Sequence, residues 1–278
     1  MSVKTGSAAW GFREIPLQKQ LKICRGMGCA YLELGIANAP GDIQLSVTKE
    51  ELLTVKKLYK KYEIQLLCAA TGNDFTLDSV REVTGQIEKI KRVTDICQEL
   101  GILYLRIFAG FSHVEKVKED RWKYMIYAIN EAAGYAKDKG VILAIETHGG
   151  VNSFSDGVMH YASVSTEVES LKQMLKEINK EVCFVLDPAN LAAVGHQNIR
   201  EQYKLLQNRI AYEHVKNFKM LPSGHLVPSS AGDGIFDWAD FLEGKPEQEG
   251  IYLVEYENPK NVEEGTKESM EDLRKWGI

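Results

Sequence analysis

The sequence predicts a single-domain (β/α)8 barrel, or TIM barrel, that spans residues 1–278. Eight short apolar runs alternate with segments of helical periodicity along the whole chain. A glycine ends several of those helical segments just before the next apolar run. The length of 278 residues is that of one such barrel, so we expect no second domain.

The apolar runs are the predicted strands, and they are continuously apolar rather than alternating between apolar and polar residues. Such runs are typical of parallel strands that are buried on both faces of a sheet. In chain order they cover residues 3–10, 30–35, 64–70, 102–109, 141–146, 182–187, 210–215 and 251–256.

The segments between the strands are the predicted helices. Gly101, Gly140 and Gly250 each stand immediately before a predicted strand, at the position where a helix usually stops. A doubly wound open sheet is the alternative fold, but it normally carries a glycine-rich phosphate-binding turn after an early strand. No such turn is present in the sequence, which favours the barrel. The predicted helices cover residues 17–27, 48–61, 78–100, 116–139, 165–179, 198–208, 237–244 and 260–275.

Composition and charge narrow the class of protein. The formal net charge of −5 argues against a general nucleic-acid or anionic-membrane binder. The five cysteines are odd in number and lack zinc-ribbon or C-x-x-C spacing, so we expect reduced thiols. No apolar run approaches the roughly 20 residues of a membrane span, and no signal segment is recognisable. We therefore expect a cytoplasmic protein.

Four polar residues stand at the ends of four predicted strands: Glu146, Asp187, His214 and Glu255. Catalytic groups of such barrels collect at the carboxyl ends of the strands, so we expect these side chains to meet. Three carboxylates placed together repel one another unless a cation lies among them. Oxygen ligands with one imidazole predict one divalent metal ion, Mn²⁺ or Mg²⁺ first, with Co²⁺ and Zn²⁺ as alternatives. The other interpretation is that the acids pair with Lys or Arg.

Further residues are expected at the mouth of the barrel. Positions i and i+2 of a strand share one face, which places His148, Lys216 and Glu257 there. Asn190 lies in the loop after the sixth strand. His148 is either a second acid–base group or a histidine satisfied by a neighbouring loop. Lys216 either holds a substrate oxygen or phosphate, or it pairs with Glu213 or Glu257.

Candidates also come from the first half of the chain. Arg106 either reaches the mouth or forms a buried pair with Glu33, and Glu33 itself is a candidate substrate ligand. Trp10, at the end of the first strand, either forms an apolar wall under a sugar ring or packs in the core. The segment 149–163 is either a lid over the mouth or a plain surface loop. We expect the remaining histidines to be loop residues: His113, His160, His196 and His225.

Four motifs carry a resemblance to a known family: I-E-T-H, L-D-P-A-N, E-H-V-K-N and V-E-Y-E. Together with G-D-G-I-F-D-W at 232–238 and L-E-L at 32–34, they are similar to the sugar phosphate isomerase/epimerase superfamily, the xylose-isomerase-like barrels. The resemblance implies that Glu146, Asp187, His214 and Glu255 bind one metal ion. It also implies that Glu146 and Glu255 form an acid–base pair, which in the family's ketose 3-epimerases deprotonates one face of the substrate and reprotonates the other.

The chain departs from those epimerases at two motifs. They carry E-P-x-N after strand five and a histidine three residues past the aspartate, whereas this chain has E-T-H and Asn190. An E-x-H fifth strand is similar to dehydratase-like and carbon–glycoside-cleaving lyases, in which His148 would be an extra acid or base. The leading hypothesis is a metal-dependent sugar isomerase or epimerase acting through an enediolate. The alternative is a metal-dependent lyase on a keto-sugar or cyclitol.

Two other classes share this barrel. The DNA-repair endonucleases of the endonuclease IV type have a histidine-rich site for several zinc ions and a basic groove. This chain has six histidines and a net negative charge, which disfavours that class. A non-catalytic sugar-binding barrel is disfavoured by the intact set of acids. We expect a small-molecule sugar or sugar derivative as the partner, with no nucleic acid and no membrane. Self-association into a homo-oligomer is compatible with this class.

Overall fold

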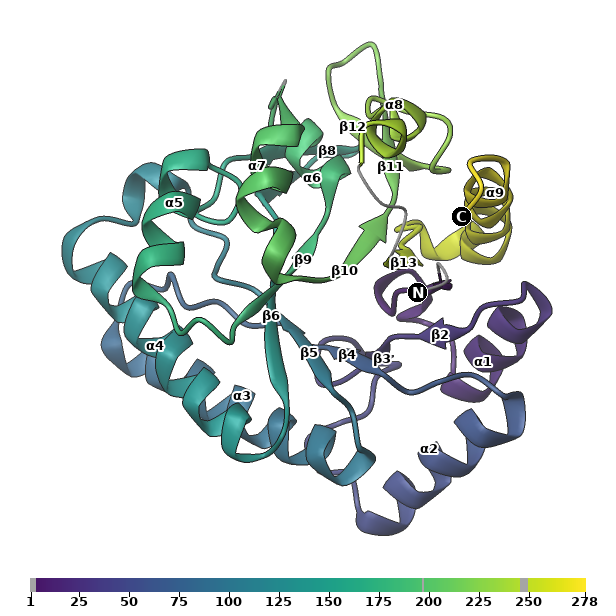
Figure 1. The fold of residues 1–278 in the computed structure, drawn as a ribbon, viewed down its shortest axis with the longest axis horizontal. Helices are drawn as coiled ribbons and strands as arrows, with labels where there is room; N and C mark the ends of the chain where they lie inside the picture. Colours follow the sequence, from purple (N-terminus) through teal and green to yellow (C-terminus); the bar gives the residue numbers. More distant parts are fainter. Residues whose placement is uncertain (1–3, 197, 246–249) are drawn as a thin grey trace.

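A computed structural model describes residues 4–196, 198–245 and 250–278, and its architecture is a (β/α)8 barrel (Figure 1). The fold class predicted from the sequence is thereby confirmed. Residue 3, with which the first predicted strand begins, and residues 1, 2, 197 and 246–249 lie outside the described residues.

The barrel wall is a ring of parallel strands, the second of which is in two pieces. Tyr31 of the second strand pairs with Gly6 on one side and with Gln65 on the other. Leu34 then pairs with Ala69, so the second strand lies between its neighbours and closes the ring. The strands in sheet order are β2 (Tyr31–Leu32), β1 (Lys4–Ser7), β13 (Ile251–Val254), β10 (Ile210–Val215), β9 (Cys183–Leu186), β6 (Ile142–Glu146), β5 (Tyr104–Ile107), β4 (Cys68–Ala70) and β3 (Leu34–Gly35).

The helices follow the predicted order, and one short helix is additional. Pro188 begins this helix, α6, and the Asp187 side chain caps it by accepting from the backbone N–H of Asn190. The strand-end aspartate therefore also starts a helix. The helices are α1 (Leu17–Gly26), α2 (Lys49–Tyr62), α3 (Val80–Leu100), α4 (Glu119–Asp138), α5 (Val168–Glu177), α6 (Pro188–Ala193), α7 (Ile199–Leu206), α8 (Trp238–Glu243) and α9 (Val262–Lys275).

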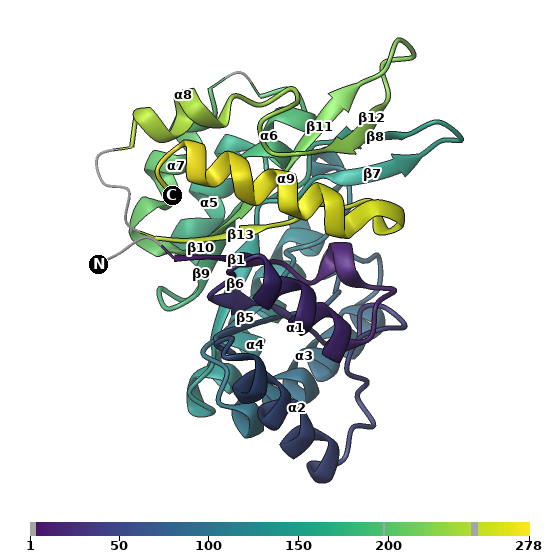
Figure 2. The ribbon, with the colours of Figure 1, turned by 90° about the vertical axis from the view of Figure 1, so that its right-hand side faces the viewer.

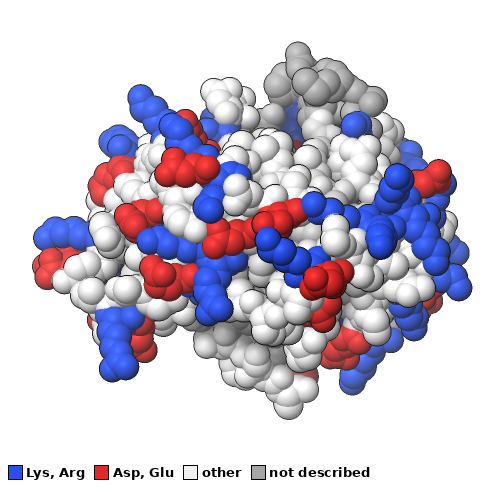
Figure 3. All heavy atoms as spheres, turned by 90° about the horizontal axis from the view of Figure 1, so that it is seen from below, with Lys and Arg blue, Asp and Glu red and all other residues white. Residues whose placement is uncertain are grey.

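Local sequence signals explain where the long helices begin and end. Thr48 and Glu51 form a reciprocal capping box at the start of α2. The helix α3 ends at Gly101, which has a φ of 76°, a conformation that glycine adopts without steric cost. Among the described residues, no helix is both long and apolar enough to cross a lipid bilayer. Seen from below, basic side chains gather towards one end of the molecule and mix with acidic ones elsewhere (Figure 3).

A second, antiparallel sheet stands at one end of the barrel (Figure 2). Its strands are β11 (Asn217–Met220), β12 (Leu226–Ser229), β8 (Val158–Tyr161) and β7 (Gly150–Ser153), in that order. The segment 149–163, for which we expected a lid or a loop, is mostly the hairpin β7–β8. The sequence conceals this hairpin because its strands are only four residues long and β7 is largely exposed.

The barrel interior has an apolar lower layer and a polar upper layer. The apolar layer is made of residues that lie on the barrel strands or, for Ala8, directly after one: Ala8, Tyr31, Cys68, Ala144, Val185, Tyr212 and Leu253. A larger apolar core fills the space between the strands and the helices. The polar layer is buried as well, and it contains Glu33, Arg106, Glu146, His214 and Glu255. Charged groups so far from water need partners within the barrel, and those partners define the site.

Candidate active site

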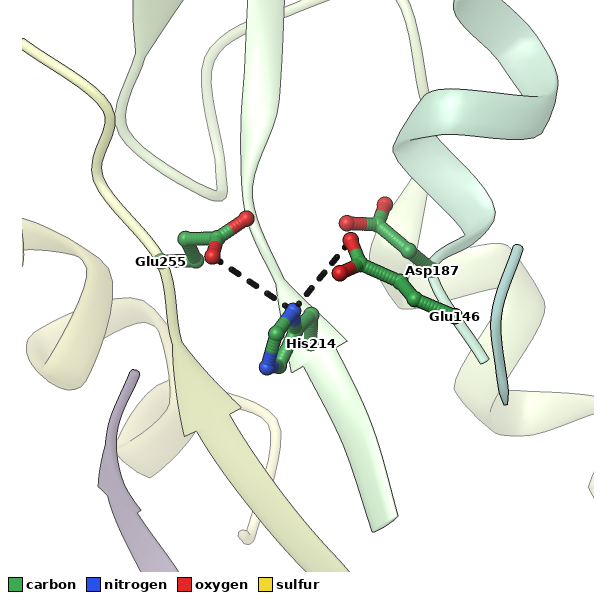
Figure 4. A group of neighbouring side chains, drawn as sticks. All are labelled: Glu146, Asp187, His214 and Glu255. Carbon is green, nitrogen blue, oxygen red and sulfur yellow. Dashed lines mark ion pairs between the residues drawn. The ribbon is translucent and has the colours of Figure 1, made fainter. Parts of the chain in front are cut away.

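The four predicted metal ligands converge at the carboxyl ends of the barrel strands (Figure 4). Glu146 is the last residue of β6 and His214 lies in β10, while Asp187 and Glu255 directly follow β9 and β13. Each residue offers one ligand atom, and these atoms all lie within 4.8 Å of one another. In Figure 4 the carboxylates of Glu255 and Glu146 lie on opposite sides of the His214 ring.

The polar atoms of this cluster face one another but do not form hydrogen bonds with one another. Nδ1 of His214 lies 3.5 Å from Oε1 of Glu146 and 3.6 Å from Oε1 of Glu255. Both ring nitrogens of His214 are buried and have no hydrogen-bond partner among the described residues. Such atoms are rare in folded proteins, and a cation among them would supply the missing partner. The residues therefore fit a divalent metal ion with carboxylate and imidazole ligands.

The charges of the cluster lead to the same interpretation. Burial raises the pKa of Asp187 to about 7; Lys216 opposes this shift, and the nearby Glu146 and Glu255 add to it. Burial alone would also raise the pKa of Glu146, but Arg106 and the imidazole beside it hold that pKa below its usual value. The charge of a metal ion among these side chains would favour the ionised form of Asp187.

Arg106 fixes the orientation of Glu146. Its Nε lies 3.2 Å from Oε2 of Glu146, and its Nη1 donates to the backbone oxygen of Thr71 at 3.1 Å. On the other side, Nδ2 of Asn190 donates to Oε1 of Glu146 at 3.3 Å. Both interpretations of Arg106 apply: it lines the cavity above the cluster, and it forms a buried ion pair, but with Glu146 rather than with Glu33.

Lys216 connects the remaining carboxylates. Its Nζ lies 2.7 Å from Oε2 of Glu255, 2.6 Å from Oε1 of Glu257 and 3.0 Å from Oδ2 of Asp187. The expected pairing with Glu257 is therefore present, whereas Glu213 pairs with Lys245 instead. Since the ammonium is fully engaged, Lys216 orients the acids of the site.

Glu33 lies behind His214 and outside the set of residues that line the cavity. Its Oε1 lies 3.5 Å from Nε2 of His214 and accepts from the Tyr212 hydroxyl at 2.6 Å, while Oε2 accepts from the backbone N–H of Ala9 at 3.1 Å. A carboxylate at the second ring nitrogen sets the tautomer and orientation of a metal-binding histidine. Sequence reasoning missed Tyr212, although its position two residues before His214 in β10 places it on the same strand face.

A cavity of about 420 Å³ opens above the cluster. Carboxylates line its floor, and aromatic side chains form much of its walls. Trp10 reaches it from a 3-10 turn after β1 rather than from the strand itself. Glu146, Glu255, Glu257, His148, Arg106 and Trp10 line it as predicted residues, together with Arg13, Asn38, Gly72, Phe108, Phe111, Val151, Ser153, Val158 and His160.

His148 forms part of the aromatic wall. Its ring centroid lies 5.2 Å from that of Phe108 and 5.6 Å from that of Phe111, with the rings edge to face. Its Nδ1 is in close contact with the backbone oxygen of Gly149, which favours a proton on that nitrogen. In that tautomer Nε2 is a free acceptor. Burial lowers the pKa of His148.

His160 is a further residue of the cavity, and the prediction of a loop position for it is wrong. It lies on β8, is 8% exposed, and has no hydrogen-bond partner for either ring nitrogen among the described residues. Its ring centroid is 6.2 Å from that of His148 and 5.0 Å from that of Phe218. Burial lowers its pKa to about 4. The sequence signal was weak, because the strand that carries His160 is only four residues long.

The chain belongs to the family of xylose isomerase-like TIM barrels, because the family model of that description matches residues 21–276. This match confirms the family expected from the motifs. No curated protein matches the chain.

Solved structures with the same fold include several enzymes. The probable 3-DHS dehydratase AsbF of Bacillus anthracis is 14% identical, with 98% of this chain and 99% of that chain covered and a TM-score of 0.75. The D-allulose 3-epimerase of a Methylomonas species is 15% identical, with 99% and 98% covered and a TM-score of 0.74. The IOLI protein with a bound zinc atom is 20% identical, with 99% and 96% covered and a TM-score of 0.73. At these identities the likeness shows the fold alone.

Proposed function

We propose that this protein is a divalent-metal-dependent isomerase or epimerase that acts on a sugar or sugar derivative. The observation that carries the proposal is the convergence of Glu146, Asp187, His214 and Glu255, two of which, Glu146 and Glu255, line a cavity. Two of these carboxylates lie on opposite sides of the imidazole, which suits proton removal from one side of a carbon and return from the other.

Glu146, Asp187, His214 and Glu255 would hold the metal ion. We favour Mn²⁺ or Mg²⁺ because three of the four ligands are carboxylates, and Zn²⁺ or Co²⁺ is the alternative. The zinc atom in the solved IOLI protein is compatible with that alternative. When bound, the metal would polarise a substrate carbonyl and make the adjacent C–H bond acidic.

The protein's own residues would then carry the proton. Glu146 is held ionised beside Arg106, so it is ready to accept a proton from the substrate. Glu255, oriented by Lys216, would carry a proton at the start of the reaction and deliver it to the other face of the enediolate. The aromatic walls, among them Phe108 and the ring of Trp10, would exclude water from the reacting carbons.

A metal-dependent lyase on a keto-sugar or cyclitol is the second candidate, and the position of His148 favours it. The Nδ1 atom of His148 faces Gly149, which leaves Nε2 available as an additional acid–base group in the cavity that the carboxylates line. Such a group could accept the proton from the substrate carbon at Nε2 and then give that proton to a leaving oxygen. The likeness to a probable dehydratase and to an epimerase leaves both reactions open.

The first experiment is metal analysis of the purified protein and of an Asp187→Ala/Glu255→Ala variant by mass spectrometry. We expect about one equivalent of divalent metal in the wild type and none in the variant. His113→Gln, a change outside the cluster, serves as the control and should retain the metal. A wild-type protein that stays metal-free after Mn²⁺ loading would overturn both candidate reactions.

The second experiment follows a panel of ketoses and keto-sugars by NMR in deuterated water. Exchange of a C–H proton with the carbon skeleton preserved supports the isomerase or epimerase, and an unsaturated or cleaved product supports the lyase. Glu146→Gln should lower either rate about 10²- to 10⁴-fold. A rate near that of the wild type would refute the role of Glu146.

The absence of nucleic-acid partners, a cytoplasmic location and a homo-oligomer all remain predictions.

A further inference from the structure

One cationic side chain that lines the cavity, Arg13, forms no ion pair with a carboxylate among the described residues. Arg13 and Arg106 are the two cationic residues among the described residues that line it. Arg106 is paired with Glu146, and Lys216, which lies behind the acids, contacts three carboxylates. Among the described residues, Arg13 has no carboxylate within ion-pair distance.

The guanidinium of Arg13 is nevertheless held in place. Its Nη1 donates to the backbone oxygens of Trp10 at 2.9 Å and of Glu257 at 3.0 Å, and the group stacks over the Trp10 ring with its carbon 4.5 Å from the ring centroid. In the described part of the chain, Nε and Nη2 meet no acceptor. A planar cation that is fixed along one edge and free along another is suited to bind an anion through charge-assisted hydrogen bonds.

The turn that carries Arg13 is packed closely against the exit of β13. A Cβ on Gly11 would lie 2.1 Å from the backbone oxygen of Tyr256, so only glycine permits this approach. The backbone oxygen of Arg13 also accepts from the N–H of Gly41 at 3.1 Å. These contacts fix Arg13 beside Glu257, which lines the cavity together with the proposed ligand Glu255 two residues earlier in the chain. The guanidinium and the carboxylates of the site therefore face the same cavity.

Another residue of the cavity, His160, adds no competing charge for an anion, because burial lowers its pKa to about 4 and its imidazole is neutral at pH 7. An anionic group on a ligand would therefore be drawn to Arg13.

We propose that Arg13 binds a carboxylate or phosphate group of the substrate, so that the substrate is an anionic sugar derivative. This inference rests on the proposed function, because it places the reacting carbons at the acidic base of the cavity and the anionic end at Trp10.

Three unreactive five-carbon probes test the proposal: ribitol, ribonate and ribitol 5-phosphate. They differ only at one end, and none has a carbonyl that could react. Their dissociation constants would be measured by calorimetry with Mn²⁺-loaded wild type, Arg13→Gln, Arg13→Lys and Arg25→Gln. Arg25 is the matched control, since it is an exposed arginine at the end of α1, paired with Glu63. Ribonate and ribitol 5-phosphate separate a sugar acid from a sugar phosphate.

We expect at least one anionic probe to bind the wild type and Arg25→Gln about 10- to 100-fold more tightly than ribitol, as charge-assisted hydrogen bonds allow. Arg13→Gln should abolish that preference, and Arg13→Lys should keep part of it. Equal binding of the three probes, no binding of either anion, or a preference that survives Arg13→Gln would overturn the proposal. Metal content and deuterium exchange test the proposed function separately, so the two failures are distinguishable.

Discussion

Protonation of His160 should destabilise the protein as the pH falls from 7 to 5. The imidazole is buried without a partner among the described residues, and its pKa is about 4 compared with an ordinary value of 6.5. Between these two values the unfolded chain binds a proton that the folded protein does not, so the unfolded state is favoured as the pH decreases. The full difference corresponds to about 3 kcal/mol, of which about 2 kcal/mol is lost between pH 7 and pH 5.

The measurement is urea unfolding of the metal-free protein at both pH values. Other groups titrate in the same range, so the informative quantity is the change in unfolding free energy of the wild type minus that of His160→Gln. The glutamine variant should lose about 2 kcal/mol less than the wild type, whereas His113→Gln, which alters a histidine that stacks on Tyr161, should behave like the wild type. Equal pH dependence of the wild type and His160→Gln would refute a neutral, partnerless imidazole at this position.

Three further changes test the support of the site. Glu33→Gln should weaken Mn²⁺ binding about 10-fold while the fold is retained, because the imidazole ligand loses its orienting carboxylate; unchanged affinity by calorimetry would contradict this. Arg106→Met should lower the unfolding free energy of the metal-free protein by about 3–5 kcal/mol, since it leaves Glu146 buried without its cation, and a loss below about 1 kcal/mol would count against that pairing. Gly11→Ala should cost about 1–3 kcal/mol by urea unfolding, whereas Gly26→Ala, with open space around its Cβ, should cost less, and equal effects would contradict the close approach.

The barrel and the convergence of four strand-end polar residues were predictable because they depend on local features. A parallel strand that is buried on both faces is continuously apolar, and the polar residue that ends it, as Glu146 ends β6, stands out against that background. The order of strands then places each such residue at the same rim. Chain order and residue type were sufficient for this part of the prediction.

The contacts that orient the carboxylates and the imidazole of the site could not be predicted, since they form across the ring of strands. Glu33 and Tyr212 are 179 positions apart, and Arg106 contacts Glu146 rather than Glu33 because of how the side chains point within the barrel. The hairpin that carries His160 was hidden for another reason. Its strands are short and partly exposed, so they lack the apolar run that identifies a barrel strand.

The partners of the two proposed acid–base residues make them unequal. Glu146 is bound by a guanidinium at one oxygen and an amide at the other, which keeps it ionised and restrains its rotation. Glu255 instead shares the ammonium of Lys216 with Asp187 and Glu257, so its charge is compensated by a group that serves two other acids. A carboxylate that stays ionised is suited to accept the first proton. The arrangement therefore favours Glu146 as the initial base.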